Sequence, residues 1–371
     1  SSGLVLRELS CKVKLDTTHV SMPDLRLRTP KSMITANVDM DFSTFADKNP
    51  GKMKVDLKGY VVKSDFVPLL ASLPSALLRS MPDTPITLNA DIDGNMRALN
   101  IRQMDITYPT VFAMKAHGKA QNLMSTDRLR ADITAYAHAY NLNFVKTMLP
   151  KSVANAFNIP SNISLKGNFN AEGTRYAARF KAEQGGGTVS GNATFDSRRM
   201  AYNAKLDASN LQLRNFLPNM PLHPFSGTLT ANGVGVDFLS PRTRLNANGA
   251  VEQFGYDRYD LSDMKLTAEV NNGTGRAVLQ SHTPLIDGTI DLTALLNPKQ
   301  VDAHLVCDLI NADFMRMGLT KRPCSTSLTA DVKMKSNLKT NHSVHGTVGN
   351  IVIRDSANAY RPENVFMDCF T

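Results

Sequence analysis

Residues 86–93 read Ile-Thr-Leu-Asn-Ala-Asp-Ile-Asp, a strict alternation of apolar and polar side chains. Successive side chains of a β-strand point to opposite faces of the sheet, so this stretch predicts a strand with one apolar and one polar face. Further segments with the same alternation are 53–57, 129–137, 163–169, 189–195, 200–208, 245–251, 264–270 and 328–335. Turns such as Asn272-Gly273 and Asp287-Gly288 are expected between them. The sequence therefore predicts a β-protein of roughly twenty antiparallel strands.

Four stretches depart from this alternation and repeat apolar residues at helical spacing. They are residues 64–79, 142–157, 211–218 and 312–319, and the first three contain a Leu-Pro step that interrupts or ends a helix. Each precedes a strongly alternating segment, at intervals of about 70 to 100 residues. Short amphipathic helices are therefore expected to punctuate a structural repeat.

This repeat predicts one continuous array over residues 1–371 in place of separate globular domains. The approximate repeats are 1–63, 64–140, 141–209, 210–310 and 311–371, and the long fourth one is expected to carry an extra hairpin. The predicted fold class is mostly β, an elongated repeat array of antiparallel strands curled into a groove.

Composition argues against several classes of protein. Of the 371 residues, 42 are Lys or Arg and 33 are Asp or Glu, which gives a formal charge of +9 without a basic run of the kind that binds nucleic acid. No segment approaches the ~20 consecutive apolar residues of a membrane-spanning helix. The chain opens at Ser1 with neither methionine nor signal peptide, so a mature protein or a piece of a longer one is expected.

The sequence also lacks the motifs of catalysis. It contains no glycine-rich phosphate loop, no GxSxG elbow and no HExxH zinc motif, so we expect no catalytic residue, metal or cofactor. Asp91-Ile-Asp93-Gly94 is similar to part of a calcium loop, but its glycine comes two positions early, and a hairpin turn is predicted instead. His342 and His345 lie three residues apart and would point to opposite faces of a strand.

The four cysteines form no CxxC pair. Cys11 and Cys307 follow the apolar phase of their segments, which predicts two small core residues. Cys324 and Cys369 are either free thiols or a disulfide in an oxidising compartment.

An open sheet with one apolar face must cover that face with a second sheet, a bilayer or an apolar ligand. The inward positions are rich in alanine and glycine, which leaves room for a trough, although closely opposed sheets or the short helices would also fill the space. The residues expected to line a groove are Leu88, Ala90, Ile92, Leu165, Phe169, Val189, Ala193, Phe195, Tyr202, Ala204, Leu206, Leu245, Ala247, Val251, Leu266, Ala268, Leu328, Ala330 and Val332.

The repeated helix-to-strand junctions resemble those of the AsmA-like superfamily, and within it the TamB-type proteins of Gram-negative bacteria. The similarity covers the chain from about residue 50 onward. The junctions that carry it are residues 65–74 with 85–95, 143–150 with 160–173, 211–218 with 225–235, and 312–319 with 324–334, of which the last lacks the Leu-Pro step.

The resemblance implies a taco-like β-groove that crosses the periplasm and is anchored in the inner membrane by a segment of the full-length protein. It implies a non-enzymatic lipid-transfer or envelope-biogenesis protein that carries phospholipid acyl chains between the inner and outer membranes, with an outer-membrane barrel protein as a further partner. The alternative is a scaffold for outer-membrane protein assembly, as in a translocation and assembly module. A surface adhesin with a dry, filled interior is a third possibility.

Overall fold

The chain is built mostly from antiparallel β-strands. The computed structural model describes residues 5–46, 49–66, 75–95, 97–122, 125–148, 157–297, 299–337 and 339–370. The strands form an open sheet that does not close on itself, and these described residues include two short α-helices, so the predicted mostly-β fold class is confirmed. Among the described residues, no helix is long and apolar enough to span a membrane.

The chain divides into two compact units. The first comprises Ser1–Gly186 and Asn215–Asn219, and the second comprises Gly187–Arg214 and Met220–Thr371. The repeat boundaries proposed from the sequence stay a prediction.

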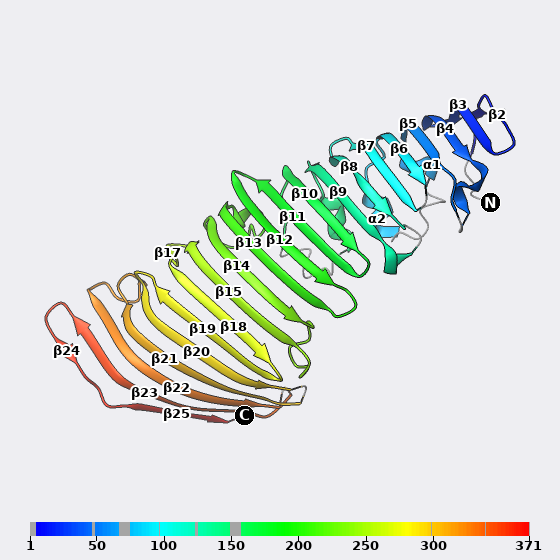
Figure 1. Ribbon diagram of the computed structural model, residues 1–371. Helices are drawn as coiled ribbons and strands as arrows, with labels where there is room; N and C mark the ends of the chain where they lie inside the picture. Colours follow the sequence, from blue (N-terminus) through cyan, green and yellow to red (C-terminus); the bar gives the residue numbers. More distant parts are fainter. Residues whose placement is uncertain are drawn as a thin grey trace. The chain divides into compact units, whose positions relative to one another are not determined.

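The first unit contains strands that lie side by side in chain order, each antiparallel to the one before it from β3 onward (Figure 1). Two short strands, β1 and β2, both pair with β3. The strands are β1 (Glu8–Ser10), β2 (Lys14–Leu15), β3 (His19–Arg28), β4 (Met33–Asp41), β5 (Met53–Val61), β6 (Ile86–Asn95), β7 (Ala98–Tyr108), β8 (Phe112–Gln121), β9 (Arg130–Ala139), β10 (Ile163–Glu172) and β11 (Arg175–Gln184). Its helical turns are η1 (Phe42–Phe45), α1 (Lys63–Phe66), α2 (Ser75–Ser80), η3 (Thr126–Arg128) and η4 (Asn143–Met148).

The second unit is likewise an antiparallel meander, and its strands bend along their length (Figure 1). Its strands are β12 (Gly187–Asp196), β13 (Ala201–Leu211), β14 (Phe225–Val234), β15 (Arg244–Gln253), β18 (Met264–Asn271), β19 (Thr274–His282), β20 (Ile286–Leu296), β21 (Val301–Asp313), β22 (Cys324–Ser336), β23 (His342–Asp355), β24 (Ala359–Tyr360) and β25 (Val365–Phe370). A separate hairpin, β16 (Gly255–Tyr256) and β17 (Tyr259–Asp260), is the extra hairpin expected within residues 210–310.

The turn chemistry explains part of this order. Asn272 and Gly273 both have positive φ angles, 50° and 75°, and join β18 to β19 as a two-residue hairpin. The turn expected at Asp287-Gly288 is wrong, because both residues lie inside β20, where the pairing with β21 shifts register.

The predicted helices are present only in part. Segment 64–79 contains α1 and α2, and segment 142–157 contains the 3-10 helix η4. Residues 67–74 and 149–156 lie outside the described residues. Segment 211–218 forms only one 3-10 turn, η5 (Leu213–Asn215).

No helix forms at residues 312–319, which corrects the fourth prediction. Ala312 and Asp313 end β21, and the Asp313 carboxylate accepts the Arg316 N–H at 2.9 Å, which starts a turn. Gly318 then adopts φ +72°, a left-handed conformation that an α-helix does not allow.

Of the two cysteines predicted to be small core residues, one is buried and the other is not. Cys307 is buried, and this burial raises the pKa of its thiol, as expected for a small core residue. Cys11 is exposed, because it lies between the short edge strands β1 and β2, whose Leu9 and Leu15 side chains are also exposed. Cys324 and Cys369 are free thiols.

Candidate functional site: an uncovered apolar face on each unit

The first unit has an apolar face that runs across every strand from β3 to β11. Directly opposed residues in antiparallel strands project to the same side of the sheet, so the pairing register defines which side chains share this face. One cross-strand row is Leu25, Ala36, Leu57, Ala90, Met104, Ala116, Ala135, Gly167 and Phe180. A second row is Met22, Val38, Val55, Ile92, Ile101, Gly118, Ile133, Phe169 and Ala178.

The second unit has a corresponding apolar face from β12 to β25. Its rows are also apolar at every strand, and ten strand spacings of ~4.8 Å make them about 48 Å long. One row is Gly191, Leu206, Leu229, Gly249, Leu266, Leu279, Ile290, Cys307, Ala330, Val348 and Val365. The neighbouring row is Ala193, Ala204, Ala231, Ala247, Ala268, Ala277, Leu292, Leu305, Val332, Gly346 and Met367.

Every candidate lining residue from the sequence lies on one of these two faces. The first unit holds Leu88, Ala90, Ile92, Leu165 and Phe169. The second unit holds Val189, Ala193, Phe195, Tyr202, Ala204, Leu206, Leu245, Ala247, Val251, Leu266, Ala268, Leu328, Ala330 and Val332. The register thus joins residues far apart in the sequence into rows within each unit.

Sequence reasoning left out other members of the same faces. Leu57, Met104 and Ala135 of the first unit and Leu279 and Leu305 of the second occupy the rows described above. The segments of Leu57, Ala135 and Leu305 carry the same alternation of apolar and polar residues, which signals their place on the face. Met104 is less visible, because the alternation breaks between Ile101 and Met104, where the pairing of β7 with β8 shifts register.

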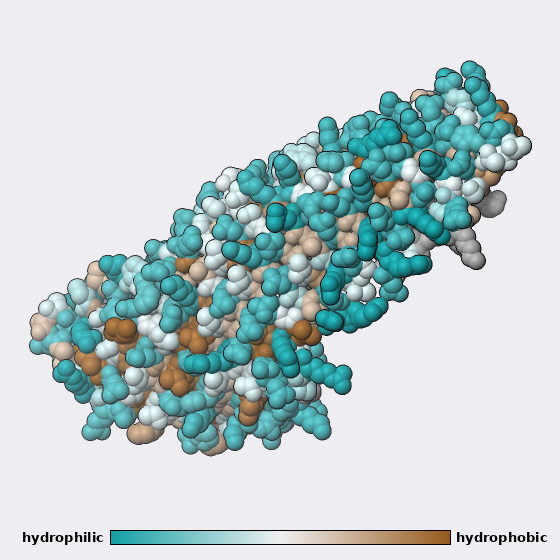
Figure 2. Space-filling model, viewed as in Figure 1, coloured by the Kyte–Doolittle hydropathy of each residue, from teal (hydrophilic) through white to brown (hydrophobic). Residues whose placement is uncertain are grey.

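The apolar faces are only partly covered. Phe169 of the first unit is 40% exposed and Leu266 of the second is 47% exposed, whereas side chains inside a filled sandwich would be buried. Apart from the small β16–β17 hairpin, the described residues contain no further sheet that packs on either face. On the side of the molecule drawn in Figure 2, hydrophobic residues reach the surface in patches over β20–β23, between hydrophilic neighbours.

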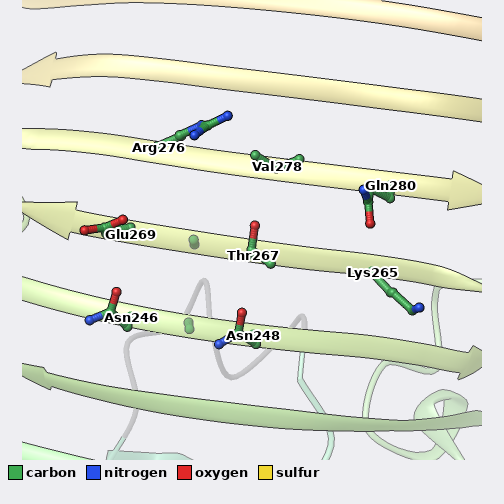
Figure 3. Close-up of a pocket in the computed structure, with 10 residues that line it drawn as sticks. Asn246, Asn248, Lys265, Thr267, Glu269, Arg276, Val278 and Gln280 are labelled. Carbon is green, nitrogen blue, oxygen red and sulfur yellow. The ribbon is translucent and has the colours of Figure 1, made fainter.

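The opposite face of the sheet is polar. Asn246, Thr267 and Gln280 stand on one side of β15, β18 and β19 and border a shallow hollow of about 290 Å³ (Figure 3). Beside them, the Arg276 Nε donates to Asp291 Oδ1 at 3.0 Å, and this pairing lowers the pKa of Asp291. Each unit therefore separates an apolar from a solvated face, as the alternation predicts.

Connecting segments cover the margin of the apolar face in the first unit. Tyr108, at the end of β7, is 1% exposed, and its hydroxyl donates to the Pro82 carbonyl of the segment between β5 and β6. In the same margin, Ser80 of α2 donates from its hydroxyl to the Phe144 carbonyl of η4 at 3.4 Å. The helical connections thus contact each other and Tyr108.

A polar cluster fixes the start of α1 at this margin. Asp65 Oδ2 accepts the Thr29 hydroxyl, the Lys31 N–H at 2.9 Å and the Ser32 hydroxyl at 2.8 Å. Partial burial acts to raise the pKa of Asp65, but these hydrogen bonds outweigh it and hold the pKa below its ordinary value. The carboxylate is therefore the stable form in the folded state.

Removing this carboxylate is expected to destabilise the first unit. Thr29 and Ser32 are each 1% exposed. Asp65→Ala removes the carboxylate that accepts from these buried hydroxyls, although the Ser32 carbonyl, 3.3 Å away, stays as an acceptor for Thr29, and should lower the unfolding free energy by about 1–3 kcal/mol at pH 7. Because the folded pKa is lowered, the contribution is present above the ordinary value of 3.8 and is lost as the pH falls through the folded pKa. Urea unfolding of the wild-type protein and Asp65→Ala between pH 7 and pH 2.5 measures this effect, because the difference between their unfolding free energies should shrink as the pH falls. Asp56→Ala, on the polar face of β5, is the control, and an equal loss in the two variants would contradict the assignment.

Comparisons with protein-family models, curated proteins and solved structures gave no match. The two apolar faces are therefore the features of this protein that point to a function. Within the described ranges, no group of His, Cys, Asp and Glu side chains is arranged to hold a metal ion. Asp93 of the calcium-like segment accepts a hydrogen bond from Asn100 Nδ2 at 2.9 Å and forms a salt bridge with Arg102. The His345 ring, in turn, contacts the carboxylate of Asp368.

Proposed function

We propose that the chain is part of a non-enzymatic lipid-transfer protein whose two apolar faces hold phospholipid acyl chains. The observation that carries this proposal is that the rows are apolar at every strand and yet remain partly open to solvent. Such a surface can accept an apolar chain at any point along its length. Each buried methylene contributes about 0.8 kcal/mol, so lipid binding needs no specific anchor residue.

The cellular setting of this proposal follows from the resemblance to AsmA-like, TamB-type proteins. In that setting, the full-length protein is anchored in the inner membrane of a Gram-negative bacterium and crosses the periplasm. Phospholipid then moves between the inner and outer membranes, where a barrel protein is a further partner.

Lipid extraction from the purified chain, combined with native mass spectrometry, tests the proposal. We expect bound phospholipid on the wild-type protein, and recovery of bound lipid after delipidation and incubation with phospholipid vesicles. A chain that stays folded and takes up no lipid in either step contradicts the proposal.

A scaffold role in outer-membrane protein assembly is the second candidate, and one observation favours it. The edge strand β25 pairs with β23 and carries exposed apolar side chains on both faces, with Phe366 77% exposed and Met367 43% exposed. Such an edge can pair with a client strand through main-chain hydrogen bonds. A photocrosslinker at Phe366 should then capture polypeptide, whereas one at Ala204 should capture lipid if the first proposal holds.

A further inference from the structure

Three connecting segments of the second unit meet at one end of its strands. The β16–β17 hairpin is held on one side by the segment before β14, because the Asp257 N–H donates to the Pro221 carbonyl at 2.7 Å and the His223 N–H donates to the Gly255 carbonyl at 2.9 Å. On its other side, the Tyr259 hydroxyl donates to the Met317 carbonyl at 2.8 Å. The hairpin is therefore fixed in place by contacts distant in sequence.

A hollow of about 320 Å³ lies on this hairpin, and Arg258 is held at its edge. The Arg258 Nη2 donates to Tyr259 Oη at 3.1 Å and to the Met317 carbonyl at 3.3 Å, and the guanidinium lies 5.2 Å from the centre of the Tyr259 ring. Gly318 contacts the guanidinium so closely that an added Cβ would come within 2.0 Å of Nη2. The position of this cation is thus defined by its neighbours, including a glycine that leaves space for it.

The same hollow also presents a carboxylate. Asp260 Oδ1 accepts the Ser262 N–H at 3.0 Å, and hydrogen bonds from Ser262 lower the pKa of Asp260, so the group is ionised at neutral pH. The His223 ring completes the lining and rests against Gly255. One small hollow therefore offers a guanidinium, an imidazole and a carboxylate.

The hollow lies beside the apolar face of the second unit. Phe254 lines it, and the Phe254 ring contacts the Phe225 ring with centroids 6.3 Å apart. The Phe225 ring lies over Gly227, with Cζ 3.0 Å from the position of an added Cβ, and Gly227 is opposed to Ala208 and Val251 of the apolar face. An amphipathic molecule could therefore place its polar end in the hollow and its apolar part on the face.

We propose that this hollow binds a phosphoethanolamine group, with the phosphate at Arg258 and His223 and the ammonium at Asp260. The inference rests on the proposed function, because it assigns the headgroup of the lipid whose acyl chains the apolar face would hold. The pairing of cation and carboxylate favours a zwitterion with N–H donors. A headgroup that carries only negative charge would be repelled by Asp260.

Lipid selection from mixed vesicles tests this inference. The wild-type chain is incubated with vesicles of equal phosphatidylethanolamine and phosphatidylglycerol content and repurified, and its bound lipids are quantified by mass spectrometry. We expect phosphatidylethanolamine to be enriched about two- to fivefold over the vesicle ratio, because an exposed ion pair changes an affinity by about this factor. Arg258→Gln should lose this enrichment, and Asp260→Asn should shift the ratio toward phosphatidylglycerol. Arg214→Gln, which removes an exposed arginine from another connection, should keep the wild-type ratio.

Two results would overturn the inference: a wild-type ratio equal to that of the vesicles, or enrichment that survives in Arg258→Gln. If the chain takes up no lipid at all, the proposed function fails, and soluble phosphoethanolamine then tests the hollow separately by NMR titration. Binding that disappears in Arg258→Gln would identify a site for the free compound, whereas no binding in the wild-type protein would refute the site.

Discussion

Ala204→Asp is expected to reduce lipid binding by the second unit at least about tenfold while the protein stays folded. Ala204 lies in the middle of a row of alanines, opposed to Ala193 on one side and Ala231 on the other. An aspartate here places a carboxylate on the surface where acyl chains would lie, and its short side chain cannot carry the charge to the margin. Covering an unpaired ion with lipid costs far more than the 1.4 kcal/mol that corresponds to a tenfold loss of affinity.

The adjacent residue supplies the matched control. Asn203→Asp adds a carboxylate of the same size one position earlier on β13, but on the exposed polar face, where Asn203 is opposed to Thr194 and Asn232. This variant should bind lipid as the wild-type protein does. Binding is measured by lipid extraction after incubation with vesicles, and circular dichroism checks that both variants are folded. Equal lipid binding by the two variants would contradict a role for the apolar face.

The part of this structure that depends on local alternation is the part that the sequence predicts well. A strand segment such as Ile86–Asp93 specifies its own apolar side, and neighbouring segments with the same phase can join only with those sides together. The candidate lining residues therefore fall into rows even though no partner strand is known beforehand. The sequence does not reveal which strands remain open to solvent, because that depends on what packs against them.

Features that depend on contacts between residues far apart in the chain cannot be predicted from the sequence alone. The Arg258 guanidinium is held by Met317 and Gly318. The local sequence around Arg258 does not indicate this contact, and neither does the sequence around residues 317–318. The helix expected at residues 312–319 has suitable apolar spacing, but the turn at Asp313 and the left-handed Gly318 override it. Cys11 follows the apolar phase and is nevertheless exposed, because its position between two short edge strands leaves it uncovered.

Tyr108→Ala is expected to cause the largest loss of stability in the first unit. An open sheet buries few large side chains, and Tyr108 is among the most completely buried, at 1% exposed. Truncating a buried aromatic residue removes its packing and leaves a cavity, which costs about 3–5 kcal/mol. The Pro82 carbonyl also loses the hydroxyl donor that connects the β5–β6 segment to the sheet. Tyr108→Phe removes only this hydrogen bond and should cost about 1 kcal/mol.

Urea unfolding followed by circular dichroism measures both effects, since the chain contains no tryptophan for fluorescence. Tyr136→Ala is the matched control, because Tyr136 is 48% exposed and lies opposite Lys115 and Lys166 on the polar face of β9. Its substitution should change the unfolding free energy by less than about 1 kcal/mol. If Tyr108→Ala were as mild as Tyr136→Ala, the connecting segment would not be anchored through Tyr108. Because this segment covers one margin of the apolar face, we further expect Tyr108→Ala to widen the solvent-accessible part of that face, which increased binding of a hydrophobic dye would detect below the unfolding transition.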